Sequence, residues 1–312
     1  MPGIAVVTNP RSRRNLRDPR LAGQLAYVLG SKGEVAQPKD REELTDTCRR
    51  FRDAGVDVLA VNGGDGTTHT ILTALMQVWG DAPLPSVALL RGGTMNTVAT
   101  GIGIRGSPAE LLGRLVAQYH AGEPIGFVER NLLRVSGDVP QYGFLFGNGL
   151  ISNYLEVYYE GSEPSPAKAA LVLAKGILSA LVGGELIQRL TRRAEVEVVA
   201  GGETWPWRSY LTVAAGTADN IGLGFKPFFR ASSHPGHMHA LGIACSARDF
   251  ILDLPRVRLG KPFTAPDVGQ AVVDRLILRG DRPLPYMVDG DFHVGGQSLE
   301  VTVGPRLRLL LP

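Results

Sequence analysis

The sequence predicts an α/β domain built on a parallel sheet, followed by an antiparallel β-sandwich with a helical insertion. Two observations carry this prediction. Up to residue 123, short apolar runs alternate with segments of helical periodicity. From residue 124 onward, short alternating runs are separated by glycine-rich turns. We therefore place an α/β domain at 1–123 and a sandwich domain at 124–312, and allow the last strand to return to the first domain.

In the first domain each expected element follows from its local pattern. Apolar runs that end in turn residues predict strands, and apolar residues at helical spacing predict helices. The strands are expected at 3–9, 34–37, 56–64 and 85–93, and the helices at 18–33, 41–55 and 67–78. Alternation of this kind implies a parallel sheet whose ligand crevice lies at the carboxyl ends of the strands.

In the second domain the strands are expected in "RNLLRVSG", "QYGFLFGNG", "AEVEVVAGG", "WRSYLTVAAG", "HMHALGIACS", "QAVVDRLILRG", "LPYMVDG", "QSLEVTVG" and "RLRLLLP". The helical insertion is expected at about 164–192, and its apolar part, 167–184, is interrupted by two lysines. This part either covers the sandwich or forms an apolar wall for a lipid. "GLGFKPFFRA" at 222–231 is either an interfacial loop or packed core.

Composition narrows the class of protein. The chain has 312 residues, of which 44% are hydrophobic and 20% charged, as in ordinary globular proteins. A net charge of +3 is too small to argue for nucleic acid. The two cysteines, Cys48 and Cys245, lie far apart and outside any CxxC pattern, which argues against a disulfide framework. With neither a signal-like start nor an uncharged apolar run of about 20 residues, we expect a cytoplasmic protein.

Three polar loops follow expected strands and should therefore open on one edge of the sheet: "TNPRS", "NGGDGT" and "RGGTMN". A glycine-rich loop between a strand and a helix allows backbone N–H groups to approach phosphate. The alternative is a tight turn in which Asp65 or Thr67 caps the helix. A carboxylate beside phosphate is repulsive unless it holds Mg²⁺ or accepts a proton, which makes Asp65 a candidate for either role. Thr94 and Asn96 supply donors in the third loop.

Two further polar groups stand in the second domain. In "YMVDGDFH" at 286–293, Asp289 and Asp291 flank a glycine that could turn both carboxylates the same way. The alternative is a solvated Asp-Gly hairpin turn. His234, His237 and His239 have a metal-like spacing, but no carboxylate or thiolate completes a ligand set, so we favour a structural role.

Together, "TNPRS" at 8–12, "GGDGT" at 63–67, "GGTMN" at 92–96 and "VDGD" at 288–291 resemble the ordered signatures of the diacylglycerol kinase catalytic family, which includes bacterial soluble lipid kinases, sphingosine kinases and ceramide kinases. The resemblance implies that Asp65 organises Mg²⁺ or acts as the base. It also implies that Asp291 accepts the proton, with Asp289 as its partner. The residues implied in binding ATP are Asn9, Pro10, Arg11, Ser12, Arg13, Gly63, Gly64, Asp65, Gly66, Thr67, Thr94 and Asn96.

The sequence departs from the family pattern at several positions. His69 and Thr70 replace an Asn-Glu pair, Thr97 replaces an aspartate, Gln37 replaces a threonine, and Pro235 replaces an aspartate that ligates a structural metal. The function predicted is transfer of the γ-phosphoryl of ATP, with Mg²⁺, to a lipid hydroxyl, with diacylglycerol as the default acceptor. NAD kinase and a non-catalytic nucleotide sensor are the alternatives. The expected partners are ATP, a lipid and the inner membrane surface; a homodimer is left open.

Overall fold

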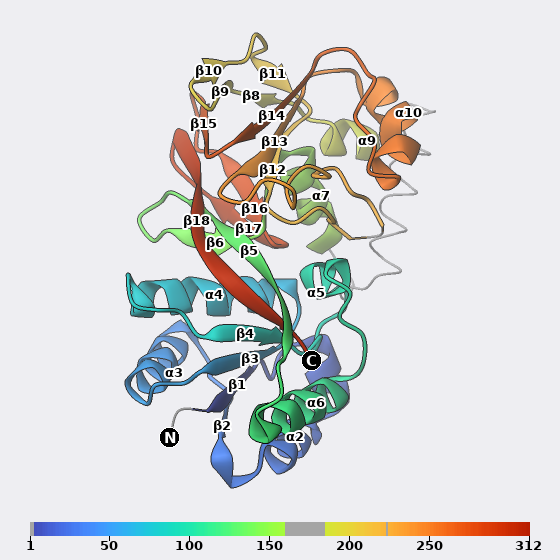
Figure 1. The fold of residues 1–312 in the computed structure, drawn as a ribbon. Helices are drawn as coiled ribbons and strands as arrows, with labels where there is room; N and C mark the ends of the chain where they lie inside the picture. The colour runs from blue at the N-terminus through green and yellow to red at the C-terminus, as the bar shows by residue number, and fades with distance from the viewer. Residues whose placement is uncertain (1–2, 160–184, 223) are drawn as a thin grey trace. The chain divides into compact units, whose positions relative to one another are not determined.

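The computed structural model describes residues 3–159, 185–222 and 224–312 (Figure 1). The apolar segment 167–184, and with it most of the expected insertion, lies outside the described residues. The chain divides into two compact units, Met1–Arg130 with Arg306–Pro312, and Asn131–Pro305. In the part of the chain that is described, no helix is both long and apolar enough to cross a membrane.

A parallel sheet forms the middle of the first unit. Its strands lie in the order β4 (Ser86–Leu89), β3 (Val58–Asn62), β1 (Ile4–Thr8) and β2 (Glu34–Ala36). The end of β18 (Ser298–Leu311) pairs in parallel with β4, so that Leu309 lies opposite Val87. Every residue of β1 and β3 is buried, as expected for strands that are covered on both faces. The predicted strands thus form the predicted parallel sheet.

Helices flank this sheet, and several of them were not predicted. α2 packs against α6, and α3 packs against α4. The predicted helices are α2 (Leu21–Leu29), α3 (Arg41–Asp53) and α4 (Asp65–Trp79), and the 3₁₀ turn η1 (Gly30–Lys32) falls within the range expected for the first of them. The helices that were not predicted are α1 (Arg13–Arg17), α5 (Thr97–Gly101) and α6 (Pro108–Ala121). α6 begins at a capping box, in which Ser107 and Glu110 satisfy each other's backbone N–H groups.

The second unit contains two main antiparallel sheets. One has the order β14-β13-β12-β7-β16-β17, with bounds Val268–Val273, Met238–Ile243, Thr212–Gly216, Leu145–Gly149, Pro285–Val288 and Asp291–Val294. The other has the order β10-β9-β15-β18, with β5 on β18 and β6 on β5. The bounds of its remaining strands are Glu203–Thr204, Glu197–Ala200, Arg275–Arg279, Gly126–Val135 and Gln141–Gly143. A small pair, β8 (Ala194–Glu195) and β11 (Ser209–Tyr210), stands apart.

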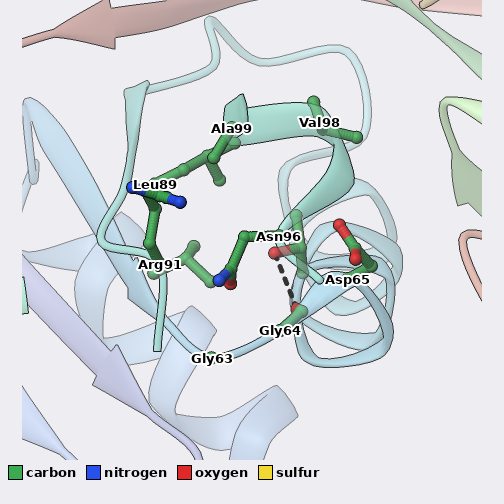
Figure 2. A pocket seen from close by; sticks show the side chains of 10 residues that line it. Gly63, Gly64, Asp65, Leu89, Arg91, Asn96, Val98 and Ala99 are labelled. Atoms are coloured by element: carbon green, nitrogen blue, oxygen red, sulfur yellow. Dashed lines mark hydrogen bonds between the residues drawn. The ribbon is translucent and has the colours of Figure 1, made fainter. Parts of the chain in front are cut away.

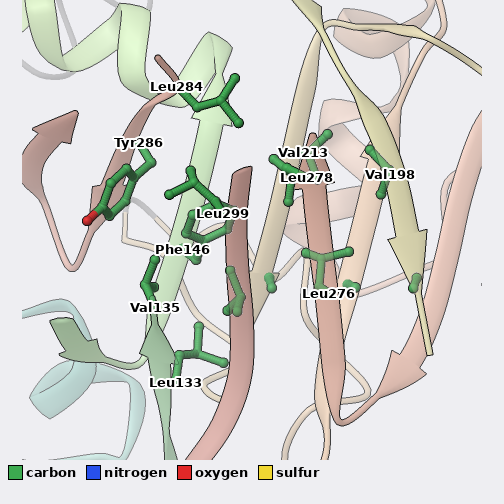
Figure 3. Packing of buried hydrophobic residues seen from close by; sticks show 14 of the residues in the cluster. Leu133, Val135, Phe146, Val198, Val213, Leu276, Leu278, Leu284, Tyr286 and Leu299 are labelled. Atoms are coloured by element: carbon green, nitrogen blue, oxygen red, sulfur yellow. The ribbon is translucent and has the colours of Figure 1, made fainter. Parts of the chain in front are cut away.

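The inner faces of these two sheets share one hydrophobic core. Val213 of β12 belongs to the same buried cluster as Leu276 and Leu278 of β15 (Figure 3). This packing of sheet on sheet is the predicted sandwich. Several details differ from the sequence prediction. The last two expected strands form one strand, β18, whereas four other expected strands are each divided into two, as β6 and β7, β8 and β9, β11 and β12, and β14 and β15. Three helices border the sheets: α7 (Leu150–Tyr159), α9 (Glu185–Leu190) and α10 (Ala247–Arg258). Only α9 falls within the range expected to be helical.

Candidate functional site

The three polar loops of the first unit meet at the carboxyl ends of their strands. The Asn9 N–H donates to the Asn62 carbonyl at 3.1 Å, which joins the end of β1 to the end of β3. The Asn9 side-chain amide donates to the Thr67 hydroxyl at 2.9 Å. The Ser12 hydroxyl donates to the Gly92 carbonyl at 3.3 Å and so joins the first loop to the third. The fold therefore brings these candidate residues together.

The glycines of the second and third loops allow the two backbones to touch. A Cβ on Gly93 would lie 2.1 Å from the Gly64 Cα, and a Cβ on Gly92 would lie 2.3 Å from the Asn62 Oδ1. A Cβ on Gly63 would overlap the Thr67 side chain at 2.3 Å. Such contacts exclude any side chain at these positions. The glycines that the sequence suggested for phosphate access thus first serve the packing of loop against loop.

A buried network of polar side chains supports the loops from below. The Asn62 amide donates to the Thr8 hydroxyl at 2.7 Å and to the Asn15 Oδ1 at 3.1 Å. The Asn15 amide in turn donates to the Thr8 hydroxyl at 3.0 Å. Sequence reasoning missed Asn15 and Asn62 as site residues. For Asn62 the available signal was a polar residue at the end of a buried apolar strand, whereas Asn15 lies in α1 and had no such signal.

The beginning of α4 supplies the electropositive end of the site. Gly64 is the N-cap, and its carbonyl accepts the first helical hydrogen bond, from the Thr68 N–H at 2.9 Å. The first N–H groups of a helix have no acceptor within the helix and attract anions. A small pocket opens here (Figure 2), lined by Val61, Gly63, Gly64, Asp65, Thr68, Leu89, Arg91, Asn96, Val98 and Ala99.

Arg91 is a pocket residue that sequence reasoning missed. Its backbone is left-handed, with a φ of 57°, which is uncommon for a residue other than glycine. Its Nε is buried and makes no hydrogen bond among the described residues. The signal in the sequence was a basic residue placed directly between a buried strand and two glycines.

Asp65 lies at the start of α4 and points toward α5. Its carboxylate accepts hydrogen bonds from the Thr97 N–H, the Thr97 hydroxyl and the Val98 N–H. Burial raises the pKa of the Asp65 carboxyl above its ordinary value, and these hydrogen bonds offset part of the rise. Thr97 stands where the family pattern has an aspartate, so Asp65 faces donors in place of a second carboxylate. The two loops are thereby tied together through side chains as well as through glycine contacts.

The donor set around Asp65 bears on whether it could bind a metal. Three N–H or O–H groups and its own backbone N–H already occupy the carboxylate, which offers about four acceptor positions. Within the described ranges, no group of three or more His, Cys, Asp or Glu side chains could hold a metal ion. The surroundings of Asp65 therefore do not fit a resident Mg²⁺.

The other candidate residues of the first unit have mixed placements. Asn96 is left-handed, with a φ of 49°, and its amide closes on Gly93, accepting from the N–H and donating to the carbonyl at 3.0 Å each. It therefore shapes the loop. The Arg11 N–H donates to the Asn9 Oδ1 at 2.9 Å, while the side chain of Arg11 is exposed. The remaining candidates lie on the same loops or open the adjoining helices: Pro10, Arg13, Gly66 and Thr94. The side chain of Arg13 is outside the described part.

In the second unit, Asp289 and Gly290 form the two-residue turn between β16 and β17, with φ values of 47° and 93°. This is the Asp-Gly hairpin of the alternative interpretation, but its aspartate is not solvated. Asp289 is only 3% exposed and accepts from the Phe144 N–H at 3.0 Å and the Leu145 N–H at 2.9 Å. A Cβ on Gly143 would lie 2.6 Å from the Asp289 Oδ2. Asp289 thus fixes the hairpin to the start of β7.

Asp291 and the histidines have different environments. Asp291 begins β17 opposite Val288 and is partly exposed. His239 is fully buried on β13, where its ring packs edge-on against Phe228 and Phe229. Burial, together with the nearby charge of Arg230, lowers the pKa of His239 to about 4. His234 and His237 are exposed in the preceding turn. A structural role for His239 is consistent with this apolar setting.

Comparisons with known proteins agree with this geometry. Residues 3–123 match the diacylglycerol kinase catalytic domain. The lipid kinase YegS of Escherichia coli K12 is 23% identical over 316 aligned positions, which cover 100% of this chain and 96% of that protein. A putative diacylglycerol kinase from Bacillus anthracis strain Sterne superimposes with a TM-score of 0.70 at 16% identity, covering 99% of this chain and 97% of that one.

The same architecture occurs in a second diacylglycerol kinase structure from that strain, with a TM-score of 0.64 and 15% identity over 100% of this chain and 97% of that one. At these identities the structural likeness shows the fold. The domain match at 3–123 covers all three loops, with their glycine contacts and the helix N-terminus that they surround. In residues 3–123, the chain is therefore similar to diacylglycerol kinase catalytic domains.

Proposed function

We propose that this protein is a lipid kinase that transfers the γ-phosphoryl group of MgATP to a lipid hydroxyl, with diacylglycerol as the first acceptor to test. The observation that carries the proposal is the group of three loops around the N-terminus of α4. The match of residues 3–123 to the diacylglycerol kinase catalytic domain supports it, and so does the name of the E. coli relative.

Backbone groups do most of the proposed nucleotide binding. The N–H groups at the start of α4 point toward the ATP phosphates, and the glycine loops keep side chains out of their way. Mg²⁺ enters with the nucleotide as part of the substrate and neutralises charge that develops on the phosphate oxygens. Asp65 holds the two loops in register through Thr97 and Val98.

Asp291 is the proposed proton acceptor. In the reaction the acceptor oxygen bonds to the γ-phosphorus, the bond from that phosphorus to the β–γ bridging oxygen breaks, and ADP leaves. The hydroxyl proton passes to the Asp291 carboxylate. Asp289 is committed to the N–H groups of Phe144 and Leu145, so its proposed part is to hold the hairpin that carries Asp291.

The direct test is incubation with γ-labelled ATP, Mg²⁺ and a total lipid extract, followed by chromatography of the organic phase. We expect a labelled lipid with the wild type and almost none with Asp291→Asn, which should unfold at the wild-type temperature. Label that survives Asp291→Asn would overturn the assignment of the base. An organic phase without label would overturn the lipid kinase.

A nucleotide sensor is the second candidate, because Asp65 and Asp289 both bind backbone N–H groups of their own chain. A sensor would be stabilised by ATP in a thermal unfolding experiment and would transfer no phosphate. The labelled-ATP experiment therefore separates the two functions.

A further inference from the structure

α10 exposes apolar side chains that the proposed reaction does not use. Leu252 is 67% exposed, and Leu259, the C-cap, is 70% exposed. One side of the helix carries four residues spaced four, four and three positions apart: Arg248, Leu252, Arg256 and Leu259. The opposite side, with Asp253 and Val257, is buried. α10 is therefore an amphipathic helix that turns leucines and arginines outward.

Of the acidic side chains of this helix, Asp253 is buried and Asp249 is partly buried, whereas Arg248 and Arg258 are exposed. Asp253 accepts from the Thr264 N–H and hydroxyl and from the Ala265 N–H at 2.6–2.7 Å. Asp249 accepts from the Ser246 hydroxyl at 2.6 Å at the helix N-terminus. Asp253 also pairs with Arg256, whose Nε lies 3.9 Å from the Asp253 Oδ1, so part of that charge is offset. Further basic residues flank the helix: Arg258, Lys261 and Lys226.

The turn before β13 continues the same surface. The Lys226 N–H donates to the Val257 carbonyl at 3.1 Å, and the Arg258 guanidinium lies over the Phe225 ring at 5.9 Å. Ile221, in this turn, is 39% exposed. Within the segment expected at an interface, Phe228 is buried in the unit, whereas Lys226 and Arg230 are exposed. We call Ile221, Lys226, Arg248, Leu252, Arg256, Arg258, Leu259 and Lys261 the basic face.

We propose that the basic face docks on an anionic lipid bilayer, with its leucines at the level of the head groups. Outward leucines among arginines and lysines are typical of helices that lie in a membrane interface. Charge complementarity selects the partner, because each basic side chain near an anionic surface strengthens binding. A second copy of this chain, paired through the same face, would place arginine opposite arginine. This proposal rests on the proposed function, because docking would bring the enzyme to a lipid acceptor that resides in the bilayer.

Vesicle sedimentation of the full chain tests the proposal without any turnover. Vesicles of mixed phosphatidylglycerol and phosphatidylcholine should bind the wild type, and phosphatidylcholine vesicles should bind it weakly. The double variant Arg248→Gln/Lys261→Gln should lower the partition coefficient by roughly fivefold for each lost charge, or about 25-fold together. Leu252→Gln/Leu259→Gln should lower it about tenfold or more.

Matched control variants make the same kinds of substitution on another surface of the protein. Arg41→Gln/Arg49→Gln removes two exposed charges from α3, and Tyr27→Gln removes an aromatic ring that is 89% exposed on α2. Both should bind vesicles like the wild type. Equal losses in the control and basic-face variants would overturn the proposal. So would unchanged vesicle binding by the basic-face variants, or a change in their sedimentation mass that marks a self-interface.

The outcome can be separated from that of the kinase proposal. Basic-face variants should phosphorylate a detergent-dispersed acceptor at the wild-type rate and a vesicle-embedded acceptor more slowly. If no lipid is phosphorylated in either form, yet vesicle binding still requires the basic face, the lipid kinase fails and the docking surface stands.

Discussion

Gly93→Ala is the sharpest test of the nucleotide site, because its effect can be worked out from one contact. The new Cβ would lie 2.1 Å from the Gly64 Cα and 2.7 Å from the Gly64 N, whereas ordinary contacts begin at 3.4 Å. The two loops would therefore have to separate by about 1.3 Å, the difference between 3.4 and 2.1 Å. Backbone lies on both sides of this contact, so no side chain can rotate away to relieve it.

The separation should lower both stability and nucleotide affinity. Overpacking of this kind destabilises proteins by about 1–3 kcal/mol. Loss of one N–H hydrogen bond to a charged phosphate, worth about 1.5–3 kcal/mol, weakens binding roughly 10- to 100-fold. Isothermal titration calorimetry with MgATP would measure the affinity, and urea denaturation would measure the free energy of unfolding.

Gly23→Ala is the matched control, since it makes the same chemical change in the interior of α2. A Cβ there meets nothing within 4 Å, and alanine is favoured over glycine in a helix by about 0.5–1 kcal/mol. This variant should be slightly more stable and should bind MgATP like the wild type. If Gly93→Ala also binds MgATP with wild-type affinity, contact between the loops does not shape the nucleotide site, and the reasoning fails.

Three other predictions concern stability. Burial lowers the pKa of His239 to about 4, from about 6.5 in the unfolded chain, so between these pH values the unfolded chain binds more protons than the folded one. The free energy of unfolding should therefore fall by up to about 3 kcal/mol as the pH drops from 6.5 to 4. Denaturation at several pH values should show a smaller fall in His239→Leu. Asp289→Ala leaves the buried N–H groups of Phe144 and Leu145 unpaired and should cost about 3 kcal/mol or more in urea denaturation; a cost below about 1 kcal/mol would contradict its structural role. Ser107→Ala breaks the capping box of α6 and should lower the free energy of unfolding by about 1 kcal/mol, with an unchanged value showing that the cap is dispensable.

The sequence predicted those parts of the fold that depend on local pattern. β1, β3 and β4 are continuous apolar runs, so each was placed within a few residues of its observed bounds. α10 was missed because Pro255 interrupts it and its exposed leucines blur the helical periodicity. α6 carried a readable signal, Ser107-Pro108 with Glu110, that was not used. These misses fall where a helix depends on its cap and its contacts more than on its apolar pattern.

The candidate site was predictable as a set of loops but not as a set of contacts. The alternation of strands and helices predicts parallel strands, whose carboxyl ends bring Asn9, Thr67 and Gly92 to one edge of the sheet. The close approach of the Gly64 and Gly93 backbones joins segments almost thirty residues apart, and no local sequence pattern encodes it. The burial of Asp289 was likewise hidden, because its partners at 144 and 145 precede it by more than 140 residues.

Two of the three candidate aspartates, Asp65 and Asp289, accept hydrogen bonds from backbone N–H groups in the structure. Asp65 binds the start of α5, and Asp289 binds the start of β7. A carboxylate occupied in this way is a poor metal ligand, and removing it should disturb the backbone before it disturbs any proton transfer. Asp291 begins β17 on the hairpin that Asp289 fixes and is partly exposed, so it stays the proposed group for the chemical step. Loss of activity at Asp65 or Asp289 therefore identifies a catalytic group only if the variant keeps the stability of the wild type.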